Sequence, residues 1–264
     1  MSGSLRLHQI CLVTHHLPPV EAQLCELFEI EPCHHSNLFD GKFGIHNVVF
    51  EIGGSFLEVV GLNPGVDPKT APAGRYLLRR GGDGGYMVIL ECNDVEKRRA
   101  HLEHHGVRIV FSPKHDGFNE IQLHPADTGG SLISLNETEG RHGLVGPYLP
   151  AGPHWWRKAR RSASALEIVG AELQSPDPRA LAQRWSGMLE KPLTQRGPDS
   201  FDMPLDLGIL QFGPATDGRG EGLGGFDLVV AERQPILQRA ARLGVMTWAD
   251  GVIVCGTRIR LVEP

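Results

Sequence analysis

The sequence predicts an α+β fold built from four copies of one unit: a strand, a helix and then two or three antiparallel strands. Two segments show the repeat most clearly, one from Gly84 to Gly106 and the other from Gly224 to Gly244. Each opens with two glycines and a run typical of a buried strand, continues as a helix and stops at a glycine. Their nearly equal length indicates one structural unit used twice.

Two further strands, Leu5–Val13 and Ile168–Leu173, are each followed by apolar residues at helical spacing. The first of these helices begins after a Pro-Pro pair. The second has Asp177 as its N-cap and Pro178 in its first turn, and both residues favour a helix start. The apolar residues behind them recur on one helical face, which predicts that both helices pack on a sheet.

Short strand candidates follow each helix and complete the four units. They cover 44–51 and 55–62 in the first unit, 108–111, 119–124 and 131–135 in the second, 207–212 in the third, and 252–255 and 258–262 in the fourth. Four units in order predict two domains of two units each, residues 1–139 and 165–264. Residues 140–164 are rich in Gly and Pro and are expected to form the linker.

The composition is that of a globular protein and restricts the classes of partner. The net charge is -5 and the sequence pI is about 6.2, so we expect neither nucleic acid nor a membrane surface as a partner. No stretch approaches the roughly 18 apolar residues of a transmembrane helix. The five cysteines are odd in number and include no C-x-x-C pair, which favours reduced thiols and a cytoplasmic location.

Two residues with metal-binding side chains interrupt strands that otherwise read as buried. His8 lies within Leu5–Val13, and Glu58 lies within Ser55–Val60. A buried carboxylate is costly unless it is paired or bound to a metal. We therefore expect His8 and Glu58 either to be half of a metal site or to form a hydrogen-bonded pair that lines a pocket.

Three motifs give the chain a family resemblance: the His8 strand, the strand Phe56–Val60, and the turn and strand His124–Leu135. With them the chain resembles the vicinal oxygen chelate superfamily, which includes glyoxalases, methylmalonyl-CoA epimerase, extradiol dioxygenases and bleomycin-resistance proteins. Residues 73–87 look like a glyoxalase-like subgroup. The resemblance implies tandem βαβββ modules that curl into two mixed-sheet cups, of which the first is functional and the second degenerate.

The resemblance also implies where a metal would bind. Superfamily members hold a divalent metal with one residue from the first strand and one from the last strand of each of two modules. His8 and Glu58 match the first-module positions, whereas Met87 and Ser134 stand at the second-module positions and are not usual ligands of a hard divalent metal. The equivalent positions in the second half fall near Gly170, Gln211, Phe226 and Arg260. We expect no metal site in that cup.

Strand alternation offers a third ligand for the first cup. Glu120, Gln122 and His124 share the polar face of their strand, which would point into the cup. His124 would then join His8 and Glu58 around one divalent metal (Zn, Mn, Ni or Fe), with Glu120 as a proton-transfer base. In the alternative, His124 only hydrogen-bonds the following turn, and the cup holds no metal.

Further residues are candidates for contact with a ligand. They are His46 on a strand near the cup, Met87 and Ser134 at the remaining two positions, and Arg79 and Arg80 in a Gly-rich segment. We expect the two arginines either to lie in a mobile loop between modules or to contact a substrate carboxylate or phosphate.

Together these features predict a small-molecule enzyme of lyase, isomerase or epimerase type that acts on a carbonyl or carboxylate compound, with Glu58 and Glu120 as catalytic residues. The alternative is a metal-free protein that binds or sequesters a small molecule, as bleomycin-resistance proteins do. An extradiol-type dioxygenase is disfavoured because the second cup lacks a His-His-Glu set. A homodimer is expected by analogy with the superfamily alone.

Overall fold

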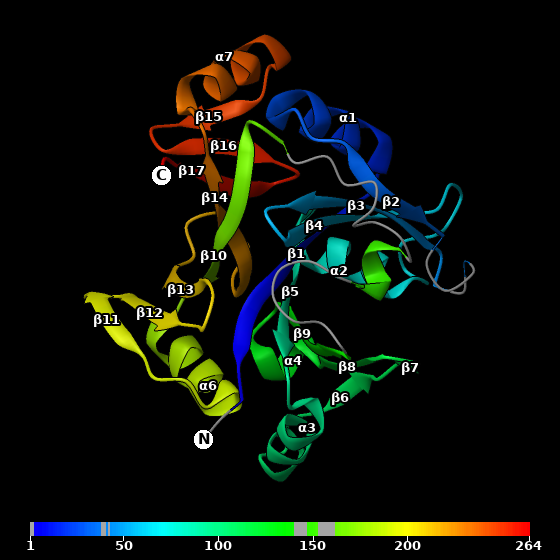
Figure 1. The fold of residues 1–264 in the computed structure, drawn as a ribbon, viewed down its shortest axis with the longest axis vertical. Helices are drawn as coiled ribbons and strands as arrows, with labels where there is room; N and C mark the ends of the chain where they lie inside the picture. The colour runs from blue at the N-terminus through cyan, green and yellow to red at the C-terminus, as the bar shows by residue number, and fades with distance from the viewer. Residues whose placement is uncertain (1–2, 38–40, 42, 140–146, 153–161) are drawn as a thin grey trace.

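The structure is a computed structural model that describes residues 3–37, 41, 43–139, 147–152 and 162–264 (Figure 1). The first half of the chain contains β1 (Leu5–Thr14), α1 (Leu17–Phe28), β2 (Pro32–Ser36), β3 (Ile45–Ile52), β4 (Ser55–Leu62), α2 (Pro72–Arg80), β5 (Gly84–Cys92), α3 (Val95–His104), β6 (Ile109–Phe111), β7 (Lys114–His115), β8 (Phe118–Leu123), α4 (Pro125–Thr128) and β9 (Leu132–Thr138). A short 3-10 helix, η2 (Leu149–Ala151), follows. Most of the linker predicted at 140–164 lies outside the described residues.

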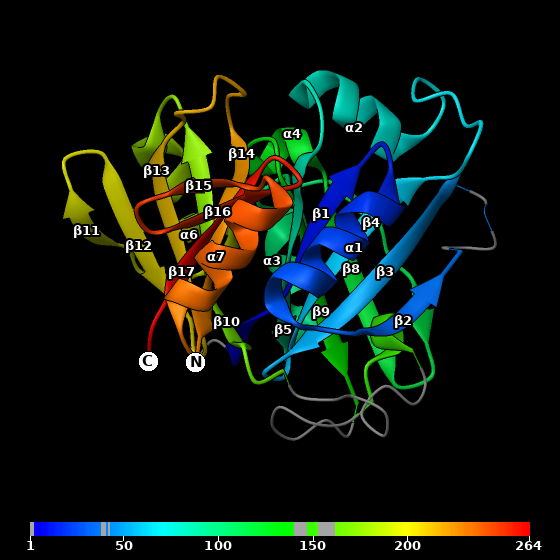
Figure 2. The same ribbon diagram turned by 90° about the horizontal axis from the view of Figure 1, so that it is seen from above.

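The second half repeats the pattern. It contains β10 (Ala165–Ser175), α6 (Pro178–Leu189), β11 (Thr194–Gly197), β12 (Ser200–Pro204), β13 (Ile209–Pro214), β14 (Gly222–Val230), α7 (Arg233–Leu243), β15 (Met246–Trp248), β16 (Gly251–Val254) and β17 (Thr257–Val262). Viewed from above, the two halves lie side by side, and α1 packs next to α7 at their boundary (Figure 2).

The strands form two mixed sheets. The first has nine strands in the order β2-β3-β4-β1-β5-β9-β8-β6, with β7 paired to β8; the second has eight in the order β11-β12-β13-β10-β14-β17-β16-β15. In each module the first strand runs parallel to the last, and in each sheet the two first strands pair antiparallel. The prediction of an α+β fold with tandem βαβββ modules in two sheets is confirmed.

An approximate twofold axis relates the two modules of the first sheet. It passes between the antiparallel strands β1 and β5 at the pair formed by Ile10 and Val88. Gln9, one residue before Ile10, therefore corresponds to Met87, one residue before Val88. Gln9 on β1 and Met87 on β5 thus occupy equivalent positions in the cup.

The last strands obey the same relationship. On β4, Glu58 lies opposite Cys11 of β1. On β9, Ser134 lies opposite Ile89 of β5, which is the counterpart of Cys11. Glu58 and Ser134 are therefore equivalent, in agreement with the positions expected from the sequence.

The two faces of the first sheet pack differently. One face carries residues such as Leu7, Ile10 and Leu12 into an apolar core that continues through α1, α3, α6, α7 and the second sheet. The opposite, concave face carries separate clusters that include Cys11 and Val13. None of the helices in the described ranges has the length and apolar character needed to cross a membrane.

One segment differs from the sequence expectation. The stretch that ends at Arg79 and Arg80 is a helix, α2, rather than a loop. Pro72 begins it, and Gly81 ends it in the left-handed conformation at φ 72°, the usual signals of a helix start and stop. Tyr76 and Leu77 of α2 pack on the concave face of the first sheet, so this helix closes one end of the cup.

Candidate active site

A cavity of about 460 Å³ opens on the concave face of the first sheet. This volume is within the range of small-molecule sites. Strands from both modules line it, together with η2 and residues 72–73 at the start of α2. Its polar lining consists of Gln9, His34, Ser36, Glu58, His115, Glu120 and Gln122, and the rest of the described lining is apolar or aromatic.

A β-bulge at His8 decides which residue of β1 enters the cavity. The register between β1 and β5 shifts between Leu7 and Gln9, so one residue is inserted and the alternation of faces changes phase. Leu7 and Ile10 both pack in the core on the opposite side of the sheet. His8 and Gln9 therefore lie on the concave side together, and Gln9 lines the cavity.

His8 occupies a different environment from Gln9. Its side chain is fully buried, and its ring lies 5.3 Å from that of Phe56 and 4.3 Å from that of Tyr148, measured between centroids. His8 does not line the cavity. The structure thus places His8 in an aromatic cluster behind the cavity wall and brings Gln9, rather than His8, into contact with Glu58.

Glu58 is held by two amide groups. Gln9 Nε2 donates to Glu58 Oε2 at 2.6 Å, and Asn47 Nδ2 donates to Oε1 at 2.5 Å. Burial raises the pKa of Glu58, the bond from Asn47 opposes that shift, and the charge of Glu120 raises the pKa further. Glu58 is therefore a fixed, buried carboxyl group whose hydrogen bonds stabilise its ionised form without neutralising it.

The two amides are themselves oriented by further hydrogen bonds. Ser36 Oγ donates to Asn47 Oδ1 at 2.7 Å, and Tyr148 Oη donates to Gln9 Oε1 at 2.9 Å. Asn136 Nδ2 in turn donates to Tyr148 Oη at 3.3 Å. Each amide thus has a defined orientation, with its nitrogen directed at Glu58.

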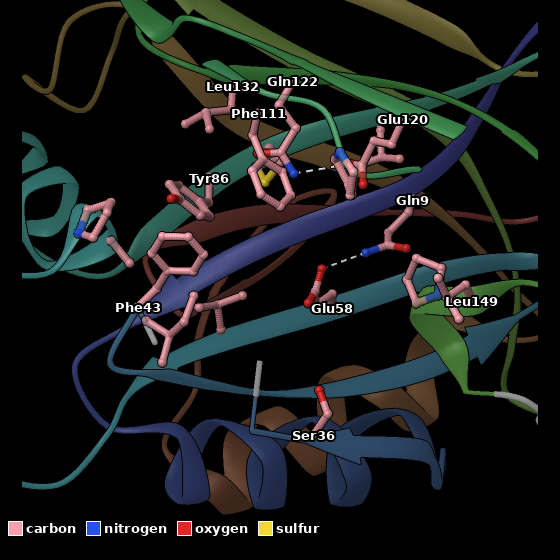
Figure 3. A pocket seen from close by; sticks show the side chains of 18 of the residues that line it. Gln9, Ser36, Phe43, Glu58, Tyr86, Phe111, Glu120, Gln122, Leu132 and Leu149 are labelled. Atoms are coloured by element: carbon pink, nitrogen blue, oxygen red, sulfur yellow. Dashed lines mark hydrogen bonds between the residues drawn. The ribbon is translucent and has the colours of Figure 1, made fainter. Parts of the chain in front are cut away.

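Glu120 enters the same cavity from β8, on the other module (Figure 3). Its Oε1 accepts hydrogen bonds from Ser134 Oγ and from Gln122 Nε2, the latter at 3.1 Å. Within the described residues no hydrogen bond goes to Oε2, which is therefore the oxygen available to a ligand. Burial raises the pKa of Glu120, and the bonds from Ser134 and Gln122 partly oppose this.

The four positions related by the twofold axis do not form a usual metal site. Gln9, Glu58, Met87 and Ser134 offer one amide, one carboxylate, one thioether and one hydroxyl. Hard and borderline divalent metals are normally held by carboxylate, imidazole or thiolate groups. No group of three or more His, Cys, Asp or Glu residues is placed to hold a metal ion in the part of the chain that the structure describes.

The second sheet fills the corresponding place with an ion pair. The register assigns Gly170, Gln211 and Arg260 to the positions of Gln9, Glu58 and Ser134. The guanidinium of Arg260 pairs with the buried carboxylate of Asp227, and its Nη2 also donates to Gln211 Oε1 at 3.0 Å. Gln211 Nε2 donates to Asp227 Oδ2 at 2.7 Å. A cation supplied by the chain therefore satisfies the acidic group of this cup.

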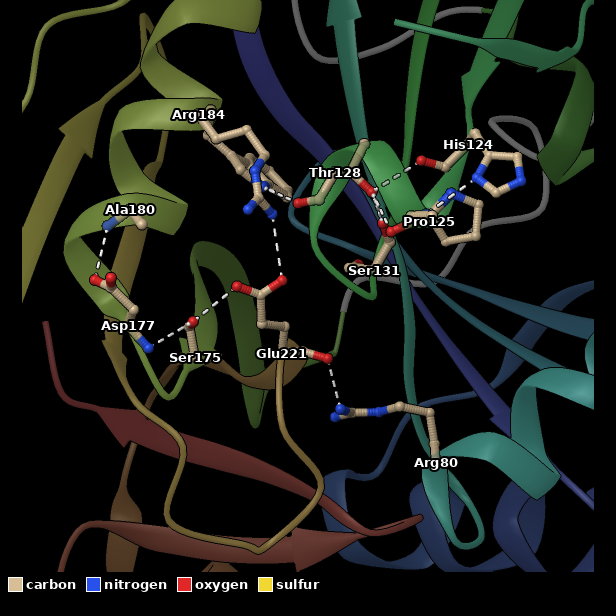
Figure 4. A network of polar contacts seen from close by, with 12 residues as sticks. Arg80, His124, Pro125, Thr128, Ser131, Ser175, Asp177, Ala180, Arg184 and Glu221 are labelled. Atoms are coloured by element: carbon tan, nitrogen blue, oxygen red, sulfur yellow. Dashed lines mark hydrogen bonds and ion pairs between the residues drawn. The ribbon is translucent and has the colours of Figure 1, made fainter.

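The remaining predicted site residues are absent from the cavity lining, and two of them, His124 and Arg80, belong to a separate network of polar contacts (Figure 4). His124 is the N-cap of α4, where its Nδ1 accepts a hydrogen bond from the backbone N–H of Ala126 at 3.1 Å. Arg80 is buried and donates to the backbone carbonyls of Arg219 and Glu221 in the second half, both at 2.6 Å.

The other two candidates make local contacts. The guanidinium of Arg79 lies 5.1 Å from the ring centroid of Tyr76. His46 Nδ1 is 2.9 Å from Asn63 Oδ1, and both residues line a second pocket together with residues 15–18. The structure thus brings Glu58, Glu120, Gln122 and Met87 together around one cavity, with Ser134 bonded to Glu120 behind its wall.

The sequence reasoning missed Gln9, Asn47 and Tyr148. A signal for Gln9 was present, because the core residues of β1 change from odd positions (Leu5, Leu7) to even ones, which requires a bulge between them. Asn47 could have been found from its alternation on β3. Tyr148 lies in the segment expected to be a linker, and nothing in the local sequence indicated that it reaches the cavity.

The chain is also similar to known proteins. A family model described as a glyoxalase-like domain matches residues 8–189. None of the curated proteins matches the chain.

Solved structures show the same fold at low sequence identity. A hypothetical protein from Staphylococcus aureus matches at TM-score 0.68 and 12% identity, over 98% of this chain and 100% of that one. The Mn(II)-bound glyoxalase from Novosphingobium aromaticivorans matches at TM-score 0.68 and 11% identity, over 100% and 83%. A mutant 4-hydroxymandelate synthase from Streptomyces coelicolor matches at TM-score 0.65 and 15% identity, over 93% and 76%.

Proposed function

This chain belongs to the family of the glyoxalase-like domain, and we propose that its first cup is the active site of an isomerase- or epimerase-type enzyme that acts on a small carbonyl compound. The observation that carries the proposal is the pair of carboxyl groups, Glu58 and Glu120, that face one largely apolar cavity from different modules. Enzymes that move a proton next to a carbonyl need a positioned base in such a water-poor site.

Glu120 is the proposed base. Ser134 and Gln122 fix its Oε1, so Oε2 can accept the proton from the carbon next to the substrate carbonyl. The C–H bond breaks as the O–H bond forms, and the electron pair moves onto the carbonyl oxygen. Returning the same proton to another carbon of the enolate gives the isomer, and returning it after the bound enolate has turned its other face to Glu120 gives the epimer. The raised pKa of Glu120 makes it a stronger base than an exposed carboxylate.

The developing oxyanion requires hydrogen-bond donors. Gln9 and Gln122 both line the cavity, and each has an amide N–H beyond the one that it donates to Glu58 or Glu120. Such preoriented amides stabilise a negative oxygen at little reorganisation cost. Glu58 is held too firmly by its two amides to exchange protons readily, and it serves as a fixed charge.

The donor set does not fit a divalent metal of the glyoxalase kind. Met87 and Ser134 supply no anionic or imidazole ligand, and the amide N–H groups of Gln9 and Asn47 are directed at the oxygens of Glu58. No step of the proposed reaction therefore passes through a metal ion.

A binding or sequestering protein is the second candidate function. The specific observation in its favour is that both oxygens of Glu58 already accept hydrogen bonds. Such an arrangement suits recognition of a ligand as well as it suits chemistry.

Solvent-exchange NMR separates the two functions. In the test, phenylacetone is incubated with the protein in D2O and the loss of its α-proton signals is followed. We expect exchange by the wild type and a loss of about 10²- to 10⁴-fold in Glu120→Gln, the usual contribution of a general base. The matched control is Glu137→Gln on β9, which lies outside the cavity lining. Binding of the ketone without exchange favours the sequestering function. Exchange that Glu120→Gln leaves unchanged contradicts the role of Glu120.

A further inference from the structure

The charge inside the first cup is unusual for a site that binds an anion. Two carboxyl groups, Glu58 and Glu120, line the cavity. The described lining contains two histidines, His34 and His115, and neither lysine nor arginine. A carboxylate or phosphate ligand placed here would face two like charges in surroundings of low dielectric constant, which is costly.

The apolar part of the lining is rich in aromatic rings. They belong to Phe43, Tyr86, Phe111, Phe118 and Tyr148. The face of an aromatic ring carries partial negative charge and attracts a cation, most strongly when water is excluded. Aromatic rings beside a fixed carboxylate are the usual means of binding an alkylammonium group.

The second cup shows how this fold satisfies a nearby buried acid, Asp227, which stands at the position of Ile89 in the cavity lining of the first cup. There, Arg260 stands at the position of Ser134, pairs with Asp227 and hydrogen-bonds Gln211, the counterpart of Glu58. In the first cup Ser134 is neutral and donates a hydrogen bond to Glu120, and the described lining of the adjoining cavity contains neither lysine nor arginine. A cation from outside the chain would complete the first cup as the guanidinium completes the second.

We propose, on the basis of the proposed function, that the substrate is a carbonyl compound that carries an ammonium or alkylammonium group on an apolar or aromatic body. Glu58 anchors the positive charge, since Gln9 and Asn47 fix its position without neutralising it. Glu120 then remains as the base at the reacting carbon. The ammonium group displaces little hydrogen bonding, because it approaches an oxygen that has lone pairs to spare.

Equilibrium binding of three probes of similar size tests this assignment. Isothermal titration calorimetry at pH 7 compares benzylammonium, benzyl alcohol and benzoate. We expect benzylammonium to bind at least tenfold more tightly than benzyl alcohol, and benzoate to bind more weakly than either. Glu58→Gln should reduce the affinity for benzylammonium about tenfold or more while that for benzyl alcohol changes little. Glu137→Gln should leave both affinities unchanged.

The variants keep the result interpretable. Glu58→Gln places an amide against two amide donors and can fail to fold. Glu120→Gln is therefore the second variant that removes a negative charge, and its amide oxygen can still accept both hydrogen bonds of Glu120. Equal affinity for the three probes, or a charge preference that both variants leave intact, overturns the proposal. The readout is independent of catalysis: a preference for the cation without ketone exchange refutes only the enzymatic function, and ketone exchange without a charge preference refutes only this assignment.

Discussion

Glu58 and Ser134 occupy equivalent positions on the last strands of the two modules in the first sheet, yet their side chains have opposite hydrogen-bonding roles. Glu58 accepts from two amides, whereas Ser134 donates to Glu120. The two modules have thus diverged at the position where the superfamily resemblance implies a metal ligand in each. One module retains the carboxylate at that position, and the other presents its carboxylate from the neighbouring strand.

This equivalence predicts that a metal site can be rebuilt. In the double variant Gln9→His and Met87→His, two imidazoles would join Glu58 in a two-histidine, one-carboxylate set. We expect this variant to bind one Zn²⁺ per chain, measured by calorimetry and elemental analysis of untagged protein, with an affinity at least 100-fold above that of the wild type. Adding His8→Ala should leave the binding intact. Loss of binding on that change would contradict the assigned register.

The raised pKa of Glu120 predicts a pH-dependent stability. Its neutral form is favoured in the folded state, so its contribution to stability is present below the ordinary glutamate range and is lost as the pH rises through the raised pKa. Glu120→Gln should therefore be more stable than the wild type at pH 8 and equal to it near pH 4. Urea unfolding at both pH values measures this.

Other ionisable groups close to Glu120 in the cavity also influence this pH dependence of stability. Glu58 and His115 also line the cavity, and the charge of His115 acts to lower the pKa of Glu120. A stability difference that is independent of pH would show that Glu120 is not the source. The control Glu137→Gln should lack the rise at pH 8.

Gln9 is expected to matter for stability as well as for function. Gln9→Leu removes the donor to Glu58 Oε2 and the acceptor for Tyr148 Oη, and both partners are buried. Losing these two buried hydrogen bonds costs about 1–3 kcal/mol, which denaturant unfolding can detect. Gln122→Leu, at a less buried position, should cost less than about 1 kcal/mol. Equal costs for the two variants would argue against the hydrogen-bond network.

The ion pair of the second cup gives a fourth prediction. Arg260→Leu leaves the carboxylate of Asp227, only 9% exposed, without its cation. Breaking a buried pair costs about 3–5 kcal/mol, and the partial exposure of Arg260 lowers the expectation to about 2–3 kcal/mol. Combining it with Asp227→Asn should recover part of the loss. In contrast, Arg258→Leu, which breaks a pair whose carboxylate, Glu172, is more exposed than Asp227, should cost about 1 kcal/mol or less.

Periodicity predicted the four modules because apolar residues repeat every 3.6 residues in the helices and every second residue in the strands. The site was harder to predict because it depends on which residues of each strand face the cavity. A single inserted residue at His8 moves Gln9 into the cavity. Residue spacing alone cannot decide whether His8 or Gln9 lines it. Glu120 and Gln122 were found by alternation because β8 is regular over their positions. Tyr148 reaches the cavity through tertiary packing, which leaves no local pattern.

The packing of α6 has a consequence for any attempt to isolate the first cup. Trp185, fully buried on α6, donates its indole N–H to the carbonyl of Thr128 at 2.7 Å, and α6 packs against both α3 and α4. A fragment ending at residue 139 would uncover this surface and leave the Thr128 carbonyl without its donor. The cavity lies in the first half, but the short helix α4, next to β9 of that half, is covered by a tryptophan from the second half. Protein engineers who want the pocket as a small scaffold therefore need to keep α6 together with the second sheet that shares its core.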